Sequence, residues 1–170
     1  WTTCHSVQWD AFTAHNESNR ELTNRLTRQS YPLGIIVNRD GRRFLDEGAD
    51  FRNYTYAKYG REILAQPQQF AWQIFDSKVL DRLRDEYRIK RMTKVRADTI
   101  EELAKKLEGV NQEQFLRTIK EWNAAVMTEV PFNPAIKDGR STRGLAVVKS
   151  NWANLIDTPP FEAYAVTCGL

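Results

Sequence analysis

Short stretches of alternating or β-branched residues predict strands in three parts of the chain. Residues 34–38 read Gly-Ile-Ile-Val-Asn, and β-branched side chains favour strands. Asp40-Gly41 follows, and such a pair is typical of a two-residue hairpin turn, because both central residues of a type I′ turn need a positive φ. Residues 42–45 are then expected to return as the second strand of a β-hairpin. Residues 70–75 and 159–167 also alternate as strands do.

Apolar residues at helical spacing predict helices, most of them in the second half of the chain. A helix over residues 56–66 is expected to stop at Pro67, and a weaker pattern covers Glu17 to Arg28. A further helical spacing joins four residues, Val79, Leu80, Leu83 and Tyr87. These patterns place helices both before and after the strand at residues 70–75.

Two more helices follow. Asp98 with Glu101 resembles a capping box and begins a helix that Gly109 ends. Asn111 begins another helix, whose buried stripe is expected to be Phe115, Ile119, Trp122 and Val126. Residues 128–144 are rich in Pro, Gly and charge and predict a loop. Together the elements predict one α+β domain, in which a β-hairpin and short strands pack with several helices.

Length and composition agree with a folded domain and exclude some functions. The chain has 170 residues, enough for one domain with a real core. Hydrophobic residues make up 41% and charged residues 28%, which argues against wholesale disorder. The net charge of +3 is too weak to indicate nucleic-acid binding by itself. No apolar run approaches the roughly 20 residues of a membrane helix.

Motifs for common cofactor and metal sites are absent from the sequence. It contains no G-x-G-x-x-G, no G-x-x-x-x-G-K-[ST], no C-x-x-C and no H-E-x-x-H. A zinc site built from Cys4, His5 and His15 would still need a fourth ligand. Cys4 and Cys168 cannot make a disulfide framework, so we expect free thiols and a reducing, cytoplasmic setting. If the chain is a domain inserted into a longer protein, as a resemblance given below implies, the two cysteines should also lie near each other, because its two ends must be neighbours. The chain does not begin with Met, and we expect it to be a piece of a longer protein.

Charged side chains concentrate directly after the predicted hairpin. The segment from Asp46 to Arg52 contains three carboxylates, one arginine and a glycine that frees the backbone to turn. Glu47 and Arg52 would suit an anionic substrate, because an arginine fork grips a carboxylate and a carboxylate beside it can relay a proton. The alternative is a surface ion pair worth about 0–1 kcal/mol. His5 has the same two interpretations, a contact to a ligand carboxylate or an ordinary polar residue near a terminus.

Two basic sets lie later in the chain. The first consists of Arg82, Arg84, Arg88, Lys90, Arg91, Lys94 and Arg96. Nucleic acid is one possible partner, but interleaved acidic residues favour a solvated face. The second set, Arg140, Arg143 and Lys149 near Trp152, has the same two interpretations.

The stretch from Tyr31 to Gln66 resembles the fumarate reductase/succinate dehydrogenase family of FAD-dependent flavoproteins. That family carries the pattern G-h-h-V-N-x-x-G-x-R-F-h-x-E, met here by Gly34, Val37, Asn38, Gly41, Arg43, Phe44 and Glu47. Arg52 and the helix end Ile63–Gln66 follow as in the family. Residues 4–10, 48–61 and 149–169 are similar to the tricarballylate dehydrogenases and their near relatives, so the resemblance runs nearly end to end.

The resemblance implies that residues 1–170 are a capping domain, inserted into an FAD-binding domain and closing over the substrate beside the flavin. The reaction would transfer hydride between FAD and a C–C bond of a dicarboxylate or tricarboxylate. The glycine motif for FAD would belong to the flanking domain, so this chain alone is expected to be inactive. Glu47 and Arg52 would contact substrate carboxylates and form part of a proton pathway, and His5 would approach the substrate.

Three departures separate the sequence from fumarate reductases themselves. The turn after Glu47 is longer. Leu80 stands where those enzymes have their catalytic arginine, which leaves Arg82, within one turn, as the expected acid. Cys168-Gly169 stands where they approach a histidine pair. Two alternatives therefore stay open: a flavoprotein lid for a steroid or a corrin precursor, and a stand-alone basic module that binds a partner such as RNA.

Overall fold

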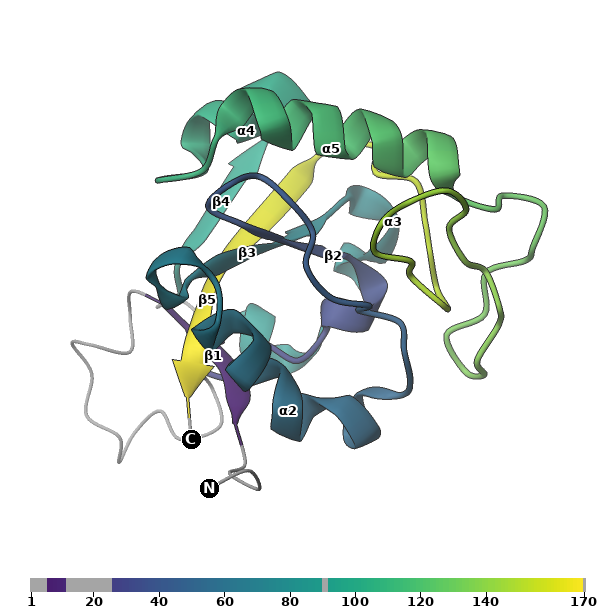
Figure 1. Cartoon of the computed structure of the whole chain (residues 1–170), viewed down its shortest axis with the longest axis horizontal. Coiled ribbons are helices and arrows are strands. Elements are labelled where there is room, and N and C mark those ends of the chain that lie inside the picture. The colour runs from purple at the N-terminus through teal and green to yellow at the C-terminus, as the bar shows by residue number, and fades with distance from the viewer. Residues whose placement is uncertain (1–5, 12–25, 90–91, 170) are drawn as a thin grey trace.

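A computed structural model describes residues 6–11, 26–89 and 92–169 of the chain (Figure 1). Cys4, His5 and His15 lie outside these residues, as does most of the helix expected from Glu17 to Arg28. Within the described residues no helix is long and apolar enough to cross a membrane. The fold is α+β, as the sequence predicts.

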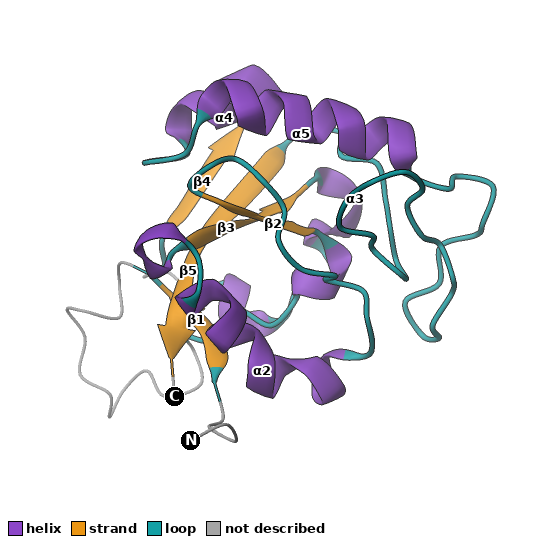
Figure 2. Ribbon diagram, viewed as in Figure 1, coloured by secondary structure: helices purple, strands orange, loops and turns teal. Residues whose placement is uncertain are grey.

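A five-stranded antiparallel sheet forms the centre of the molecule (Figure 2). Its strands are β1 (Val7–Asp10), β2 (Ile35–Asn38), β3 (Ala71–Phe75), β4 (Lys94–Ala97) and β5 (Phe161–Gly169). The order is β1-β5-β3-β2, and β4 pairs with the first half of β5 while β1 pairs with its second half. The long β5 therefore joins every strand except β2 directly.

Helices cover both faces of the sheet. They are α2 (Arg52–Leu64), α3 (Ser77–Leu80), α4 (Ile100–Lys106) and α5 (Gln112–Ala125), with short 3-10 turns at Tyr31–Leu33, Pro67–Gln69 and Asp85–Tyr87. Alternation along β2 separates two cores. Ile35 and Val37 pack in the cluster that contains the α4 and α5 side chains, whereas Ile36 packs with Tyr59 and Ile63 of α2. All four residues of β2 are consequently buried.

The predicted hairpin is present as a turn but not as a pair of strands. The Asn38 amide bonds to the Arg42 carbonyl at 2.9 Å, and Gly41 has a φ of 75° whereas Asp40 has no positive φ. This is a three-residue loop with glycine in the left-handed position, not the expected type I′ turn. Residues 42–45 form only an isolated bridge between Val37 and Arg43, because the Ile36 amide bonds to a side chain, the Glu47 carboxylate.

The helix predictions hold in part. Asn111 caps α5 by accepting a bond from the Gln114 amide at 3.0 Å, and the predicted stripe of four apolar residues is buried. The cap of α4 is Thr99, one residue after the expected Asp98. α2 begins four residues earlier than expected, at Arg52. The spacing at 79–87 was wrong as a single helix, since α3 ends at Leu80.

Candidate functional site

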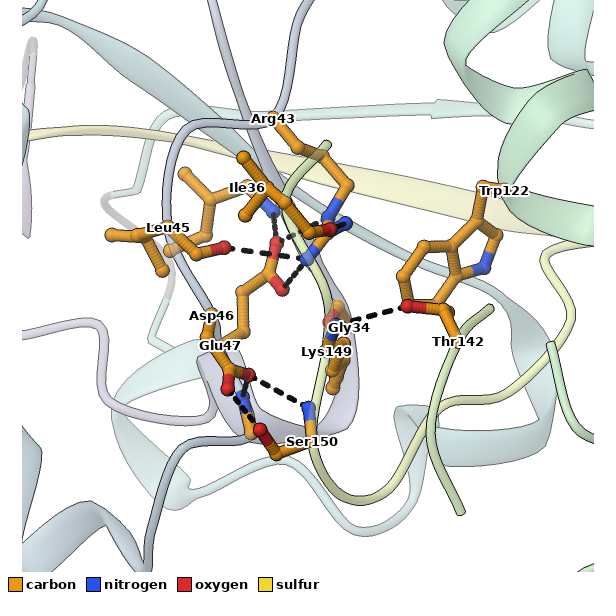
Figure 3. Close-up of polar contacts among 12 residues, drawn as sticks. Gly34, Ile36, Arg43, Leu45, Asp46, Glu47, Trp122, Thr142, Lys149 and Ser150 are labelled. Carbon is orange, nitrogen blue, oxygen red and sulfur yellow. Dashed lines mark hydrogen bonds and ion pairs between the residues drawn. The ribbon is translucent and has the colours of Figure 1, made fainter. Parts of the chain in front are cut away.

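The Glu47 carboxylate lies inside the domain, directly after the hairpin (Figure 3). Its side chain is 0% exposed. One oxygen, Oε1, accepts bonds from the Ile36 amide at 2.8 Å and from Arg43 Nε at 3.0 Å, and Oε2 accepts Arg43 Nη2 at 2.6 Å. Two parallel bonds to one guanidinium are the strong fork geometry. The alternative of a surface ion pair is therefore wrong for Glu47, and its arginine partner is Arg43, not Arg52.

Arg43 also donates hydrogen bonds to two backbone carbonyls. Nη1 donates to the Val147 carbonyl at 2.6 Å, and Nη2 also reaches the Leu45 carbonyl at 3.3 Å. The guanidinium carbon lies 4.7 Å from the centre of the Trp122 ring, within cation–π range. Arg43 thus ties the hairpin to the segment around Val147 and is left with little capacity for a ligand.

A buried lysine completes this group. Lys149 is 0% exposed, and its Nζ donates to the carbonyls of Pro32 at 2.7 Å and Gly34 at 2.6 Å. Burial lowers the pKa of Lys149 from 10.5 to about 8; the Glu47 carboxylate pulls in the opposite direction and Arg43 adds to the lowering. We call Arg43, Glu47 and Lys149 the buried charge cluster.

Lys149 is the residue of this group that the sequence did not reveal. Its place among Arg140 and Arg143 suggested an exposed basic set, and that expectation is wrong for Lys149. The apolar run before it, Leu145-Ala-Val-Val148, gives no usable signal, because Val148 is itself 44% exposed.

Arg52 lies in a different environment, at the first position of α2. Its Nη1 donates to Gln29 Oε1 at 2.8 Å, and its guanidinium carbon lies 6.0 Å from the centre of the Tyr56 ring. Among the described residues nothing else binds the guanidinium, so several donors stay available. The N-cap residue, Phe51, offers no side-chain cap, so the positive end of the helix dipole adds to the arginine charge.

Charged and aromatic residues are the chain neighbours of Arg52. Asp50 accepts the Phe51 amide at 2.8 Å and pairs with Lys137 at 3.5 Å. The Phe51 ring lies 5.4 Å from the Trp152 ring, and Tyr54 is 74% exposed. We call Asp50, Phe51, Arg52, Tyr54 and Lys137 the Arg52 edge. It combines a cation that has free donors with exposed aromatic surface.

The other predicted site residues do not join Arg52 or Glu47. Arg82 is exposed just beyond α3, with its guanidinium carbon 5.6 Å from the centre of the Phe132 ring. His5 lies outside the described residues. Apart from Arg82, the described members of the first basic set form ion pairs with nearby acids, for example Arg88 with Asp85 and Arg96 with Glu162. Such pairs fit a solvated face.

No metal site or cysteine pair emerges from the part of the chain that the structure describes. No group of three or more His, Cys, Asp or Glu side chains in that part is arranged to hold a metal ion. Cys168 lies on β5 opposite Gln8, but Cys4 is outside the described residues, so their expected proximity stays a prediction.

Comparison with known proteins finds a likeness to two fumarate reductases, one in sequence and one in structure. No family model matches the chain. A stretch of 95 residues is 34% identical to a probable fumarate reductase, Ifc3, of Shewanella frigidimarina (strain NCIMB 400), covering 54% of this chain and 15% of that protein. The open conformation of a flavocytochrome c3 fumarate reductase superposes with a TM-score of 0.60 and 27% identity, over 85% of this chain and 23% of that one.

Two steroid dehydrogenases share the fold. The 3-ketosteroid Δ1-dehydrogenase of Sterolibacterium denitrificans gives a TM-score of 0.56 at 20% identity over 98% of this chain. The 3-ketosteroid-Δ4-(5α)-dehydrogenase of Rhodococcus jostii RHA1 gives 0.55 at 19% identity over 99%. The chain spans 33% and 32% of these two proteins. The chain is thus similar in sequence to a fumarate reductase and similar in fold to oxidoreductases that are several times longer.

Proposed function

We propose that this chain is the substrate-capping domain of an FAD-dependent oxidoreductase that transfers hydride between FAD and a C–C bond of a dicarboxylate or tricarboxylate. The observation that carries the proposal is the guanidinium of Arg52, which keeps free donors at the start of α2. The 34% identity to a probable fumarate reductase supports the chemical class. The likeness of residues 48–61 to tricarballylate dehydrogenases favours a tricarboxylate.

Arg52 would act by binding and polarising a carboxylate. A guanidinium fork holds two carboxylate oxygens at once, and the positive end of α2 favours the same charge. A cation on the carboxylate also withdraws electron density from the neighbouring carbons, where charge develops during hydride transfer. Closure of the Arg52 edge over the substrate would exclude water and strengthen these contacts.

FAD would supply the redox chemistry once bound, as hydride acceptor or donor. The 170 residues contain no G-x-G-x-x-G to cradle its pyrophosphate, so this chain fits the substrate side of the site and a flanking FAD-binding domain would hold the cofactor. We therefore expect the isolated chain to bind no FAD and to be inactive.

The remaining residues have weaker support. The burial of Glu47 and its two bonds to Arg43 favour a positioning role for this carboxylate over direct proton relay. Arg82 is exposed, which leaves it available as the proposed proton donor. His5 is proposed as a second polar contact to the substrate on the basis of the resemblance alone.

A steroid is the alternative substrate, and one observation favours it. Tyr54 is 74% exposed and Phe51 is 36% exposed beside Arg52. Exposed aromatic surface suits an apolar ring system better than a small carboxylate. Under this alternative Arg52 would contribute little to binding.

Arg52→Ala in the complete protein separates the two substrates. Loss of a charge-assisted bond of about 1.5–3 kcal/mol should lower kcat/KM for tricarballylate or succinate roughly 10- to 150-fold. Arg61→Ala is the matched control, because Arg61 is exposed near the other end of the same helix. Equal kinetics in wild type and Arg52→Ala would refute the carboxylate proposal. Turnover of a 3-ketosteroid that is insensitive to Arg52→Ala would establish the alternative.

A further inference from the structure

Four consecutive residues, Lys149–Trp152, grip the turn that leads to Arg52; we call them the strap. The grip begins at Asp46, whose Oδ1 accepts the Ser150 amide at 3.0 Å and the Gly48 amide at 2.9 Å. Asp46 Oδ2 accepts the Ser150 hydroxyl at 2.5 Å (Figure 3). One carboxylate thus joins the strap to the turn and also shapes the turn itself.

The second point of the grip is a close approach of backbone to backbone. Asn151 Nδ2 donates to the Gly48 carbonyl at 2.9 Å. A Cβ atom built on Gly48 would lie 2.1 Å from the Asn151 carbonyl oxygen, far closer than atoms can approach. Only glycine lets the turn and the strap meet at this distance.

The third point is the end of the strap. The Trp152 ring lies 5.4 Å from the ring of Phe51, the residue before Arg52. Trp152 is itself fixed, because its amide donates to Asp138 Oδ1 at 2.9 Å and its indole Nε1 donates to the Ile136 carbonyl at 2.7 Å. Its φ of 58° is the left-handed conformation, which the surrounding bonds hold in place.

Lys149 anchors the strap to the sheet. Its backbone amide donates to Thr142 Oγ1 at 3.0 Å, and its Nζ bonds to the carbonyls of Pro32 and Gly34 just before β2. A buried ammonium loses its hydration, and its bonds recover only part of that cost. The anchor therefore fixes the position of the strap more than it stabilises the fold.

We propose that Asp46, Ser150 and Asn151 are positioning residues that set where the free side of the Arg52 guanidinium points. They act through the turn at residues 46–51, which they hold at Asp46 and at Gly48, and they do not themselves contact the substrate. The inference rests on the proposed function, because it takes Arg52 as the carboxylate contact.

The first experiment tests the grip without any assay of activity. Amide hydrogen exchange is followed at Gly48 in the complete protein, for Ser150→Ala, Asn151→Ala and the control Ser141→Ala. Ser141 lies on the same loop, and its hydroxyl donates only to the neighbouring Thr142 carbonyl at 3.3 Å. Loss of one bond of about 0.5–1.5 kcal/mol should speed exchange roughly 2- to 12-fold in the two strap variants and not in the control. Unchanged exchange in both strap variants would overturn the inference.

The second experiment tests the link to Arg52. Ser150→Ala and Asn151→Ala should raise KM for the carboxylate substrate roughly 3- to 10-fold with little change in kcat, and Ser150→Thr, which keeps the hydroxyl, should restore KM. In an Arg52→Ala background the same changes should have no further effect on KM. If Arg52→Ala leaves KM and kcat unchanged, the proposed function fails, while the hydrogen-exchange test of the strap still stands. If Arg52→Ala weakens binding but both strap variants leave KM unchanged, the strap inference alone fails.

Discussion

Arg43 and Arg52 are nine positions apart in one charged stretch, yet their surroundings are opposite. Arg43 has a side chain that is 5% exposed, and its donors go to Glu47, Val147 and Leu45. Arg52 has one hydrogen-bonded partner among the described residues, Gln29, and lies at a helix start without a side-chain cap. The supply of partners within the domain, not the local density of charge, separates a structural arginine from one that is available to a ligand.

The same contrast applies to the energy of the two regions. In the buried charge cluster each ion has lost its water and depends on its partners. At the Arg52 edge the charges keep part of their hydration, and an exposed pair such as Asp50 with Lys137 contributes about 0–1 kcal/mol. Substitutions should therefore affect folding in the cluster and binding at the edge.

The largest effect on stability is expected for Glu47→Gln. This change keeps the shape of the side chain but removes the charge that compensates the buried guanidinium of Arg43. Breaking a buried pair in this way should cost about 3–5 kcal/mol of the free energy of unfolding, measured by urea denaturation. Asp50→Asn, at the exposed pair, serves as the control. A cost for Glu47→Gln as small as that of the control would abolish the distinction between the two regions.

Lys149 should give the next largest effect, visible as a dependence of stability on pH. Its pKa is about 8 in the folded protein and 10.5 in its ordinary state, so the unfolded chain binds the extra proton between these values. Folding stability should therefore rise with pH, by about 2 kcal/mol between pH 7 and pH 9.5. Lys149→Met should remove this rise. Urea denaturation at a series of pH values measures it.

Neighbouring groups limit the pH window of that measurement. Burial lowers the pKa of Lys149 and Arg43 adds to the lowering, whereas Glu47, Asp46 and Asp138 raise it. Burial also raises the pKa of Tyr31 and Tyr87. The stability that these two neutral side chains contribute is lost only as the pH rises above about 10, which lies outside this window. A wild-type stability that stays flat or falls up to pH 9.5 would contradict the assignment of a charged, buried Lys149.

The smallest effect on stability is expected for Arg52→Ala. Within the part of the chain that the structure describes, the side chain has one hydrogen-bonded partner, and it is partly solvated. Because alanine is also a good helix former, the change in unfolding free energy should stay within about 0.5 kcal/mol. Arg43→Ala, by contrast, leaves Glu47 buried without its partner and should be strongly destabilising. Thermal melting of the two variants side by side gives the comparison. Equal losses would mean that Arg52 is structural as well.

The sequence predicted elements where local chemistry decides the structure. The cap at Asn111 and the stripe from Phe115 to Val126 were correct, since both depend on residues within a few turns of each other. β4 was missed because Lys94 and Arg96 make its pattern look like a solvated segment, although Val95 packs against the core.

Long-range contacts explain what the sequence could not reveal about the site. The motif that ends at Glu47 marks the right region, but the burial of Glu47 depends on a bond from the Ile36 amide, eleven positions earlier, which takes the place of strand pairing with residues 42–45. Lys149 reaches carbonyls more than a hundred positions away in the chain. Periodicity within one segment carries no information about such partners.

Trp122 gives the buried charge cluster an optical signal. Two cations stand close to its indole, with the Arg43 guanidinium carbon at 4.7 Å and Lys149 Nζ at 5.8 Å from the ring centre, and its Nε1 donates to the Asn154 carbonyl at 2.8 Å. The excited indole redistributes electron density across its two rings, so its emission colour responds to the local electric field. Loss of the Lys149 proton removes one unit charge from that field. The emission wavelength of Trp122 should therefore report the charge state of Lys149 inside the buried charge cluster.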